Sequence, residues 1–104
     1  MAYKKIVWTE TAANQRNNIL KYWAKRNKSN TYSLKLLKLN NDKTQQIAQN
    51  PNIYRQSDFP ETRIASMGHF SICYKIEENA IIITAFWDNR QDPKKLLQEL
   101  KKIR

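Results

Sequence analysis

Charged and hydroxyl-bearing residues beside short apolar runs carry the possible chemistry of this sequence, and the stretch from Ile81 to Leu96 is the most informative. In it a β-favouring run passes within a few residues into an Asp/Asn/Arg cluster and then into a proline. Arg90 lies in this cluster, between Asp88 and Asp92. A guanidinium fixed where a buried strand ends can bind a phosphate or a carboxylate through its planar N–H groups. The alternative is an ion pair with Asp88 or Asp92 that only holds the turn together.

Three further side chains are candidates for proton transfer or for contact with a phosphate. His69 is the only histidine and suits acid–base chemistry near neutral pH, although its place beside Gly68 in a predicted turn also fits an ordinary exposed residue. Tyr74 carries a phenol, but strand alternation places it on the packed face of a sheet. Arg63 lies opposite Tyr74 in the predicted hairpin, where it either contacts a ligand or closes the hairpin edge.

Several other classes of site have no counterpart in the sequence. It contains no Cys/His spacing typical of a metal site, no glycine-rich loop for a nucleotide and no Ser-His-Asp set. We therefore expect neither a metal nor a small-molecule cofactor. The single Cys73 excludes an internal disulfide and favours a reducing compartment. No apolar run approaches the ~20 residues that span a bilayer, and no apolar signal segment follows Met1, so we expect a cytoplasmic protein without a membrane partner.

Positive charge is the main feature of the composition. The chain of 104 residues has 19 Lys and Arg against 9 Asp and Glu, a formal net charge of +10. Its length fits one domain over residues 1–104. The first fifty residues contain ten basic side chains and only Glu10 and Asp42 as acids. Because like charges repel within a fold, so large an excess indicates a negatively charged partner.

Two amphipathic helices are predicted after a first strand at Tyr3 to Trp8. Thr9 or Thr11 can cap the first helix. A polar break at residues 27–30 precedes the second helix, which Pro51 ends. Two successive helices joined by a short link form an antiparallel hairpin. The apolar stripe of the first helix is formed by Ala12, Ile19, Leu20 and Trp23.

Three short runs then predict a β-meander, at Glu61–Met67, Phe70–Ile76 and Ala80–Trp87. Gly68-His69 suits a tight turn with glycine first, and Glu78-Asn79 suits one in which Asn79 takes a positive φ. The turns fix a register. Across the first turn the predicted pairs are Met67 with Phe70, Ala65 with Ile72 and Arg63 with Tyr74. Across the second they are Tyr74 with Ile83, Ile72 with Ala85 and Phe70 with Trp87.

The predicted fold is α+β in the order β-α-α-β-β-β. A helical hairpin packs on a four-stranded, mainly antiparallel sheet, and the tail from Pro93 forms a C-terminal helix. The packed face of the sheet is predicted to hold Ala65, Met67, Phe70, Ile72, Tyr74, Ile76, Ile81, Ile83, Ala85 and Trp87.

This order of elements in a basic chain of this length resembles the RelE/ParE superfamily of bacterial toxins from toxin–antitoxin pairs. Two segments carry the likeness. Arg63 to Tyr74 is similar to the hairpin of that family, with an Arg, a turn of small residues, an aromatic residue and a Tyr. Ile83 to Pro93 is similar to its last strand followed by an Arg-containing exit.

The resemblance implies one of two activities, because the family contains ribosome-dependent mRNA endonucleases and gyrase poisons. Two positions depart from the nuclease pattern. Ser71 follows Phe70 where an Arg often stands, and Leu96 lies in a tail that lacks the usual Tyr. The exit reads Phe-Trp-Asp-x-Arg-x-x-Pro, which looks more like the ParE-type branch. If the chain is a nuclease, its candidate catalytic residues are Arg63, Arg90, His69 and Tyr74.

The resemblance therefore implies the toxin of a type II pair, which arrests growth by binding DNA gyrase without catalysis. Its other expected partner is a cognate antitoxin, acidic and partly disordered, that neutralises it. A nuclease that cuts mRNA on the ribosome is the first alternative, and a non-toxic basic nucleic-acid-binding module is the second. The residues expected to contact the target or the antitoxin are Arg63, Arg90, Lys94, Lys95, Lys101, Lys102 and Arg104.

Overall fold

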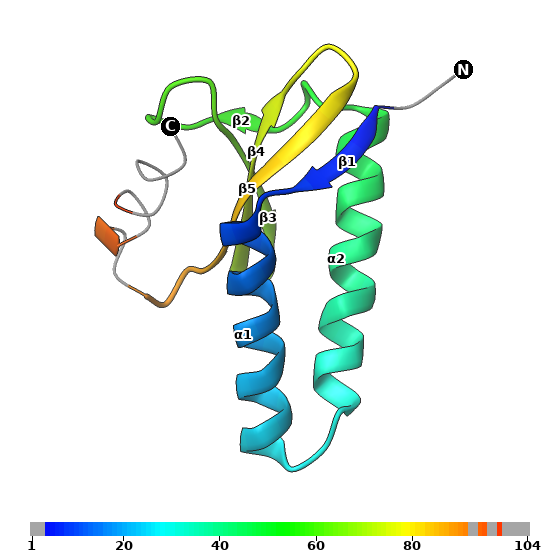
Figure 1. Ribbon diagram of the computed structural model, residues 1–104, viewed down its shortest axis with the longest axis vertical. Coiled ribbons are helices and arrows are strands. Elements are labelled where there is room, and N and C mark those ends of the chain that lie inside the picture. Colours follow the sequence, from blue (N-terminus) through cyan, green and yellow to red (C-terminus); the bar gives the residue numbers. More distant parts are fainter. Residues whose placement is uncertain (1–3, 92–93, 96–97, 99–104) are drawn as a thin grey trace.

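Strand β1 is followed by two helices and then by four more strands (Figure 1). The computed structural model describes residues 4–91, 94–95 and 98 of the chain. The elements are β1 (Lys5–Trp8), α1 (Glu10–Asn27), α2 (Thr31–Gln49), β2 (Arg55–Gln56), β3 (Arg63–Met67), β4 (Phe70–Ile76) and β5 (Ala80–Asp88).

Helix α1 begins and ends with the local signals that the sequence contains. Thr9 is extended, and its side chain accepts a hydrogen bond from the backbone N–H of Ala12 at 3.1 Å, which satisfies a free donor of the first turn. The predicted cap is therefore confirmed at Thr9. At the other end Lys28 has a positive φ of 52°, and its N–H bonds to carbonyls of the last turn. The chain can then reverse within three residues into α2.

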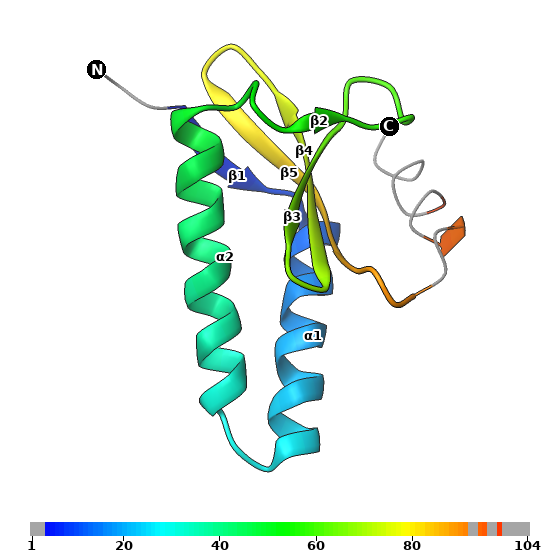
Figure 2. The same ribbon diagram turned by 180° about the vertical axis from the view of Figure 1, so that it is seen from behind.

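Helices α1 and α2 form the predicted antiparallel hairpin and lie side by side in both views (Figures 1 and 2). A buried hydroxyl ties them, because Ser33 of α2 donates to the carbonyl of Leu20 of α1 at 2.7 Å. Both helices pack on one face of the sheet through a shared core. Its buried members are Ala12, Leu36, Ile47, Ala65, Met67, Phe70, Ile72, Tyr74, Ile81, Ile83 and Phe86.

The sheet has five strands in the order β1-β5-β4-β3-β2, so the predicted count of four is wrong. The additional strand is β2, which pairs antiparallel with β3. It is only two residues long, too short for any alternation of apolar and polar residues to be seen in the sequence. Strand β1 pairs in parallel with β5, and the remaining pairs are antiparallel.

The register predicted across the first turn is confirmed, and the second is correct only in part. Met67 faces Phe70, and Tyr74 faces Ile83, as expected. Phe70, however, faces Asp88 rather than Trp87, because the pairing shifts between Cys73 and Tyr74. A β-bulge of this kind places one extra residue in one strand and reverses the facing of all later side chains.

The bulge exchanges the residues at the end of β5. Phe86 enters the main core, where it is 1% exposed and its ring stacks on Phe70 at 5.6 Å. Ala85 leaves that core and joins Cys73 and Phe59 in a second buried cluster on the other face. The prediction of Ala85 and Trp87 on the helix-covered face was therefore wrong.

Two further expectations concern turns and the tail. Among the described residues, positive φ angles occur at Lys28, Glu61 and Gly68, so the expectation for Gly68 is confirmed and that for Asn79 is wrong. The predicted C-terminal helix from Pro93 falls mostly outside the described residues, and no helix after β5 is among the elements that the structure describes. Neither α1 nor α2 has the length and apolar character needed to cross a membrane, and the same is true of every other helical residue described.

Candidate partner-binding groove

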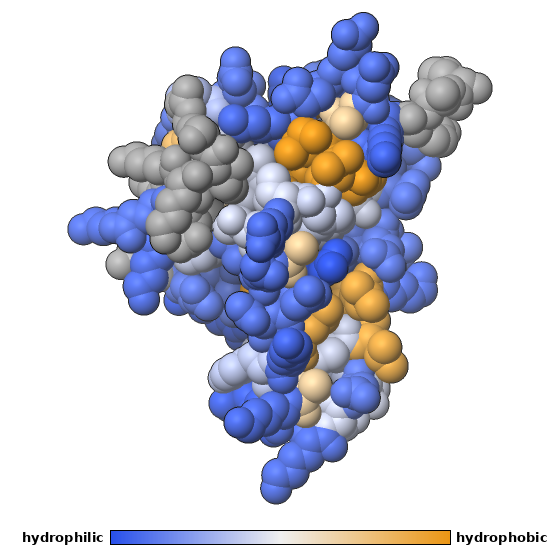
Figure 3. Space-filling model, in the orientation of Figure 1, coloured by the Kyte–Doolittle hydropathy of each residue, from blue (hydrophilic) through white to orange (hydrophobic). Residues whose placement is uncertain are grey.

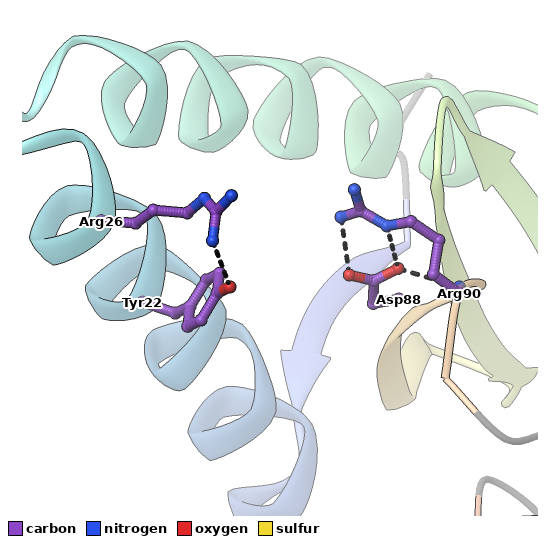
Figure 4. Close-up of polar contacts among 4 residues, drawn as sticks. All are labelled: Tyr22, Arg26, Asp88 and Arg90. Atoms are coloured by element: carbon purple, nitrogen blue, oxygen red, sulfur yellow. Dashed lines mark hydrogen bonds and ion pairs between the residues drawn. The ribbon is translucent and has the colours of Figure 1, made fainter.

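Arg90 is held just beyond the end of β5 by the carboxylate of Asp88. Its Nε donates to Oδ1 of Asp88 at 2.9 Å and its Nη2 donates to Oδ2 at 2.7 Å, which makes a bidentate pair (Figure 4). The backbone N–H of Arg90 also donates to Oδ1 at 2.9 Å. These hydrogen bonds hold the pKa of Asp88 below its ordinary value, so the carboxylate remains charged at neutral pH. The predicted pairing with Asp88 is present, and Asp92 lies outside the described residues.

Aromatic rings fix the same guanidinium from the other side. The Arg90 guanidinium carbon lies 5.4 Å from the ring centroid of Trp23 and 5.9 Å from that of Phe70. The side chain is nevertheless 47% exposed. A planar cation that is both stacked and bidentate has little rotamer freedom left to lose when a ligand binds. The predicted rigid guanidinium at the exit of the last strand is thus found in the structure.

An open groove of about 580 Å³ runs between α1 and the exit of β5. Trp23 lines it, and the guanidiniums of Arg26 and Arg90 both lie over the Trp23 ring. Arg26 donates from Nη1 to the hydroxyl of Tyr22 at 3.3 Å, and its guanidinium carbon lies 5.8 Å from the Trp23 centroid. Figure 4 shows the side chains of Arg26 and Arg90 pointing toward the same gap from opposite sides. The groove is lined by Asn18, Ile19, Tyr22, Trp23, Arg26, Asp88, Arg90 and Gln91.

The helix side of this groove was not predicted from the sequence. Trp23 was assigned to the packed stripe of α1, and it does pack partly against the core. Tyr22 and Arg26 are four residues apart and therefore adjacent on the helix surface, next to that stripe. This spacing of an aromatic residue and a cation was the available signal, but nothing in the sequence indicates that β5 ends beside it.

Arg63 and Tyr74 lie at the other end of the sheet and bond to the backbone of the fold. Arg63 donates from Nη1 to the carbonyls of Asn52 at 3.3 Å and Tyr54 at 2.6 Å. Its partner strand residue Tyr74 is four residues from Phe70, the partner of Asp88, which is roughly 13 Å along β4 at ~3.3 Å per residue. Arg63 is therefore separate from the groove, and its contact with a target stays a prediction.

Tyr74 is fully buried, and its hydroxyl donates to the carbonyl of Pro51 at 2.6 Å. Burial raises its pKa to about 12, although the positive charge of Arg63 partly opposes this. A phenol in this state bonds to the chain itself and is poorly suited to proton transfer near neutral pH. The prediction that Tyr74 belongs to the core is confirmed.

His69 is the one nuclease candidate near Arg90. It is exposed in the turn between β3 and β4, and its carbonyl accepts the N–H of Asn89 at 2.8 Å. This hydrogen bond, together with the pairing of Phe70 with Asp88, places the His69 backbone beside the strand end that carries the Asp88–Arg90 pair. His69 and Arg90 are thus together at one end of the sheet, whereas Arg63 and Tyr74 are at the other.

The basic tail is described only in part. Lys94 and Lys95 are exposed after the exit of β5. Lys95 also lines a second groove, of about 550 Å³, that adjoins the first along α1. The predicted contacts at Lys101, Lys102 and Arg104 lie outside the described residues.

The part of the chain that the structure describes contains neither a candidate metal site nor a reactive thiol. Those residues form no group of three or more His, Cys, Asp or Glu that could hold a metal ion. Cys73 is fully buried, and burial raises the pKa of its thiol to about 12. A thiol that stays protonated is a poor nucleophile.

The fold and this groove define a small α+β protein with two arginines and aromatic side chains in a candidate binding groove at the end of its last strand. A family profile described as "ParE toxin of type II toxin-antitoxin system, parDE" matches residues 6–93, a region that ends just beyond Arg90. The chain therefore belongs to the ParE toxin family of type II toxin–antitoxin systems.

A solved structure supports the fold assignment. The structure titled "Chromosomal ParDE TA system from P. aeruginosa" matches with a TM-score of 0.71 and 19% sequence identity. The match covers 81% of this chain and 94% of that chain. At this identity the likeness concerns the fold. A comparison with curated proteins gave no significant match.

Proposed function

We propose that this protein arrests bacterial growth by binding DNA gyrase, and that a cognate acidic antitoxin neutralises it. Membership of the ParE toxin family supports a toxin of a type II pair. The observation that carries the choice of mechanism is the fixed guanidinium of Arg90. It is exposed, stacked and held in one orientation before any partner arrives. Arginine is enriched among the few residues that contribute most of the binding energy at protein interfaces, and a preorganised side chain loses less entropy on binding.

The distribution of the nuclease candidates favours binding over catalysis. Cleavage of a phosphodiester by its neighbouring 2′-hydroxyl needs a base, an acid and a cation around one phosphate. Arg63 donates to backbone carbonyls and Tyr74 is buried with its hydroxyl bonded to Pro51. Neither lies near Arg90. Among the described residues, the groove therefore offers charge and shape to a partner rather than a full set of catalytic groups.

The role of Arg90 is tested by inducible expression in bacteria. Arg90→Ala should abolish growth arrest while the protein remains folded, because the Arg90 side chain is about half exposed and lies outside the hydrophobic core. Arg55→Ala is the matched control, since Arg55 is an exposed arginine on β2 at the opposite side of the sheet. If Arg90→Ala unfolds the protein and activity falls only with the amount of folded protein, the role of Arg90 is structural.

The target is tested with purified gyrase. We expect the wild-type protein to block the supercoiling of plasmid DNA by gyrase and to leave cellular transcripts intact. Arg90→Ala should no longer block supercoiling. Transcripts cut at codons in the ribosomal A site would instead support an mRNA endonuclease. Co-expression of a short acidic gene that neighbours this one should restore growth if it encodes the antitoxin.

The endonuclease remains a second candidate because the carbonyl of His69 accepts a hydrogen bond from Asn89, the residue between Asp88 and Arg90. A histidine beside an arginine can supply both a proton and charge stabilisation at a phosphate. Under this alternative His69→Ala should abolish cleavage as completely as Arg90→Ala does. Under gyrase binding His69→Ala should leave most of the growth arrest in place.

A further inference from the structure

We propose that the groove between α1 and the exit of β5 binds single-stranded nucleic acid directly. In this arrangement a phosphate contacts Arg26 and Arg90, and a base stacks on Tyr22. The inference concerns a site on the toxin itself and does not rest on gyrase as the target.

The charge around the groove calls for an extended anion. Residues 11–41 contain seven basic side chains and no carboxylate. Near the groove, Arg90 pairs with Asp88, whereas Arg26 has no ion pair with any residue that the structure describes. Two guanidiniums that share one Trp23 ring repel each other, and an anion between them relieves that repulsion. Backbone phosphates meet this requirement at regular intervals.

Tyr22 supplies a platform for a flat ligand. Tyr22 is 55% exposed, so its ring is accessible to a ligand. Its ring stands edge-on to Trp23 at 5.2 Å and 89°, and its hydroxyl accepts from Arg26. The ring is therefore already ordered, so stacking a base on it loses little conformational entropy. Such stacking is worth about 1–3 kcal/mol per base in single-strand binding proteins.

Amide side chains extend the surface along α1. Asn18 and Gln91 line both the main groove and the adjoining one, where Asn14 and Gln98 also lie. An amide both donates and accepts, as the edges of nucleobases do. An acidic peptide would use the two arginines but would leave the Tyr22 ring and the amides without matching groups. The combination of cations, an exposed ring and amides therefore favours a nucleic-acid strand.

The test is fluorescence anisotropy of the full chain with a short labelled oligothymidylate at several salt concentrations. Tyr22→Ala should weaken binding roughly tenfold or more, and Tyr22→Phe should bind like the wild type because it keeps the ring. Arg26→Gln should weaken binding and reduce the slope of log affinity against log salt by about 0.7. Lys38→Gln removes the same charge from α2, away from the groove, and should have little effect.

Several outcomes would overturn the inference. One is an equal loss of affinity in Lys38→Gln and Arg26→Gln, which would show only general charge attraction. Others are unchanged binding by a folded Tyr22→Ala, or wild-type binding to polyglutamate but not to the oligonucleotide. If Tyr22→Ala does not fold, the affinities of Arg26→Gln and Lys38→Gln for the oligonucleotide are compared, and the inference is supported only if Arg26→Gln binds more weakly. Growth arrest is measured separately. A protein that arrests growth but does not bind the oligonucleotide refutes this inference alone. A protein that binds the oligonucleotide but does not arrest growth refutes only the toxin proposal.

Discussion

Arg90 shows why the type of cation matters as well as its charge. Its side chain makes two hydrogen bonds to Asp88 and stacks over Trp23 at 5.4 Å. A lysine keeps the charge but can neither bond in this bidentate way nor stack its plane on a ring. The geometry of this side chain, rather than the local potential, should therefore decide activity.

We predict that Arg90→Lys loses most of its growth arrest, while the free energy of unfolding changes by less than about 1 kcal/mol. The small stability effect follows because the Arg90 side chain is 47% exposed and lysine keeps a positive charge beside the mostly buried Asp88. Induced growth curves and urea unfolding measure the two quantities. Full activity in Arg90→Lys would show that charge alone is sufficient.

Cys73 and Tyr74 make the fold sensitive to alkali. Burial raises both pKa values to about 12, from ordinary values of 9.0 for the thiol and 10.0 for the phenol. Above pH 9 the unfolded chain loses the thiol proton while the folded chain keeps it, so unfolding becomes more favourable as pH rises. The contribution is constant below pH 9 and is lost progressively toward pH 12.

We predict that Cys73→Ala has a shallower decline in stability above pH 9 than the wild type. The thiol accounts for up to roughly 4 kcal/mol across its full shift, at ~1.4 kcal/mol per pKa unit. Chemical unfolding at a series of alkaline pH values gives both slopes. If the free energy of unfolding falls with pH at the same rate in both proteins, the thiol has the same pKa in the folded and unfolded states, and the prediction is wrong.

At the scale of elements, the bulge in β5 determines which side chains form the core. Thr84 lies between Ile83 and Ala85, the residues on either side of the register shift, and its hydroxyl is buried without a hydrogen-bond partner among the described residues. A buried hydroxyl in that state costs free energy, which a methyl group of the same shape avoids.

We therefore predict that Thr84→Val raises the free energy of unfolding by about 1 kcal/mol. Growth arrest should be unchanged, because Thr84 does not line the groove. Thermal unfolding provides the measurement, and Thr84→Ala serves as a control that removes both the hydroxyl and the methyl group. Destabilisation by Val would show that the hydroxyl makes a bond that the structure does not reveal.

The same bulge separates the part of the strand register that can be predicted from the sequence from the part that cannot. The β3–β4 register follows from a single local cause, the two-residue turn with Gly68 at φ +63°. The register beyond Cys73 depends on an extra residue whose insertion no local pattern indicates, so alternation placed Trp87 in the core instead of Phe86. Strand β2 was not predicted because it is too short to show a pattern in the sequence. The helix side of the groove was not predicted because only the tertiary fold brings Trp23 next to Arg90.

For the whole molecule, the net charge of +10 acts against compactness. Hydrophilic side chains cover most of the face seen in Figure 3, between separate apolar patches. Acids are too few to offset the basic side chains, and the salt bridges among the described residues are Lys38–Asp42 and Arg90–Asp88. The folded state therefore concentrates repulsion that added salt screens.

We predict that the free energy of unfolding rises as sodium chloride is increased from low to physiological concentration. The double substitution Lys25→Gln and Lys28→Gln removes two exposed charges, one in the last turn of α1 and one at its C-cap, and should weaken this dependence. Urea unfolding at each salt concentration provides the slopes. A stability that falls with salt would indicate that attraction, not repulsion, dominates the surface.

The parallel pairing of β1 with β5 has a consequence for the cell that makes this toxin. Strand β1 leaves the ribosome first but cannot pair until β5 has been made, because β5 is its sole neighbour among the described strands of the sheet. Until translation has passed Asp88, the nascent polypeptide has neither its complete sheet nor Arg90 in place. Interrupted synthesis would thus release harmless fragments rather than a partly active poison.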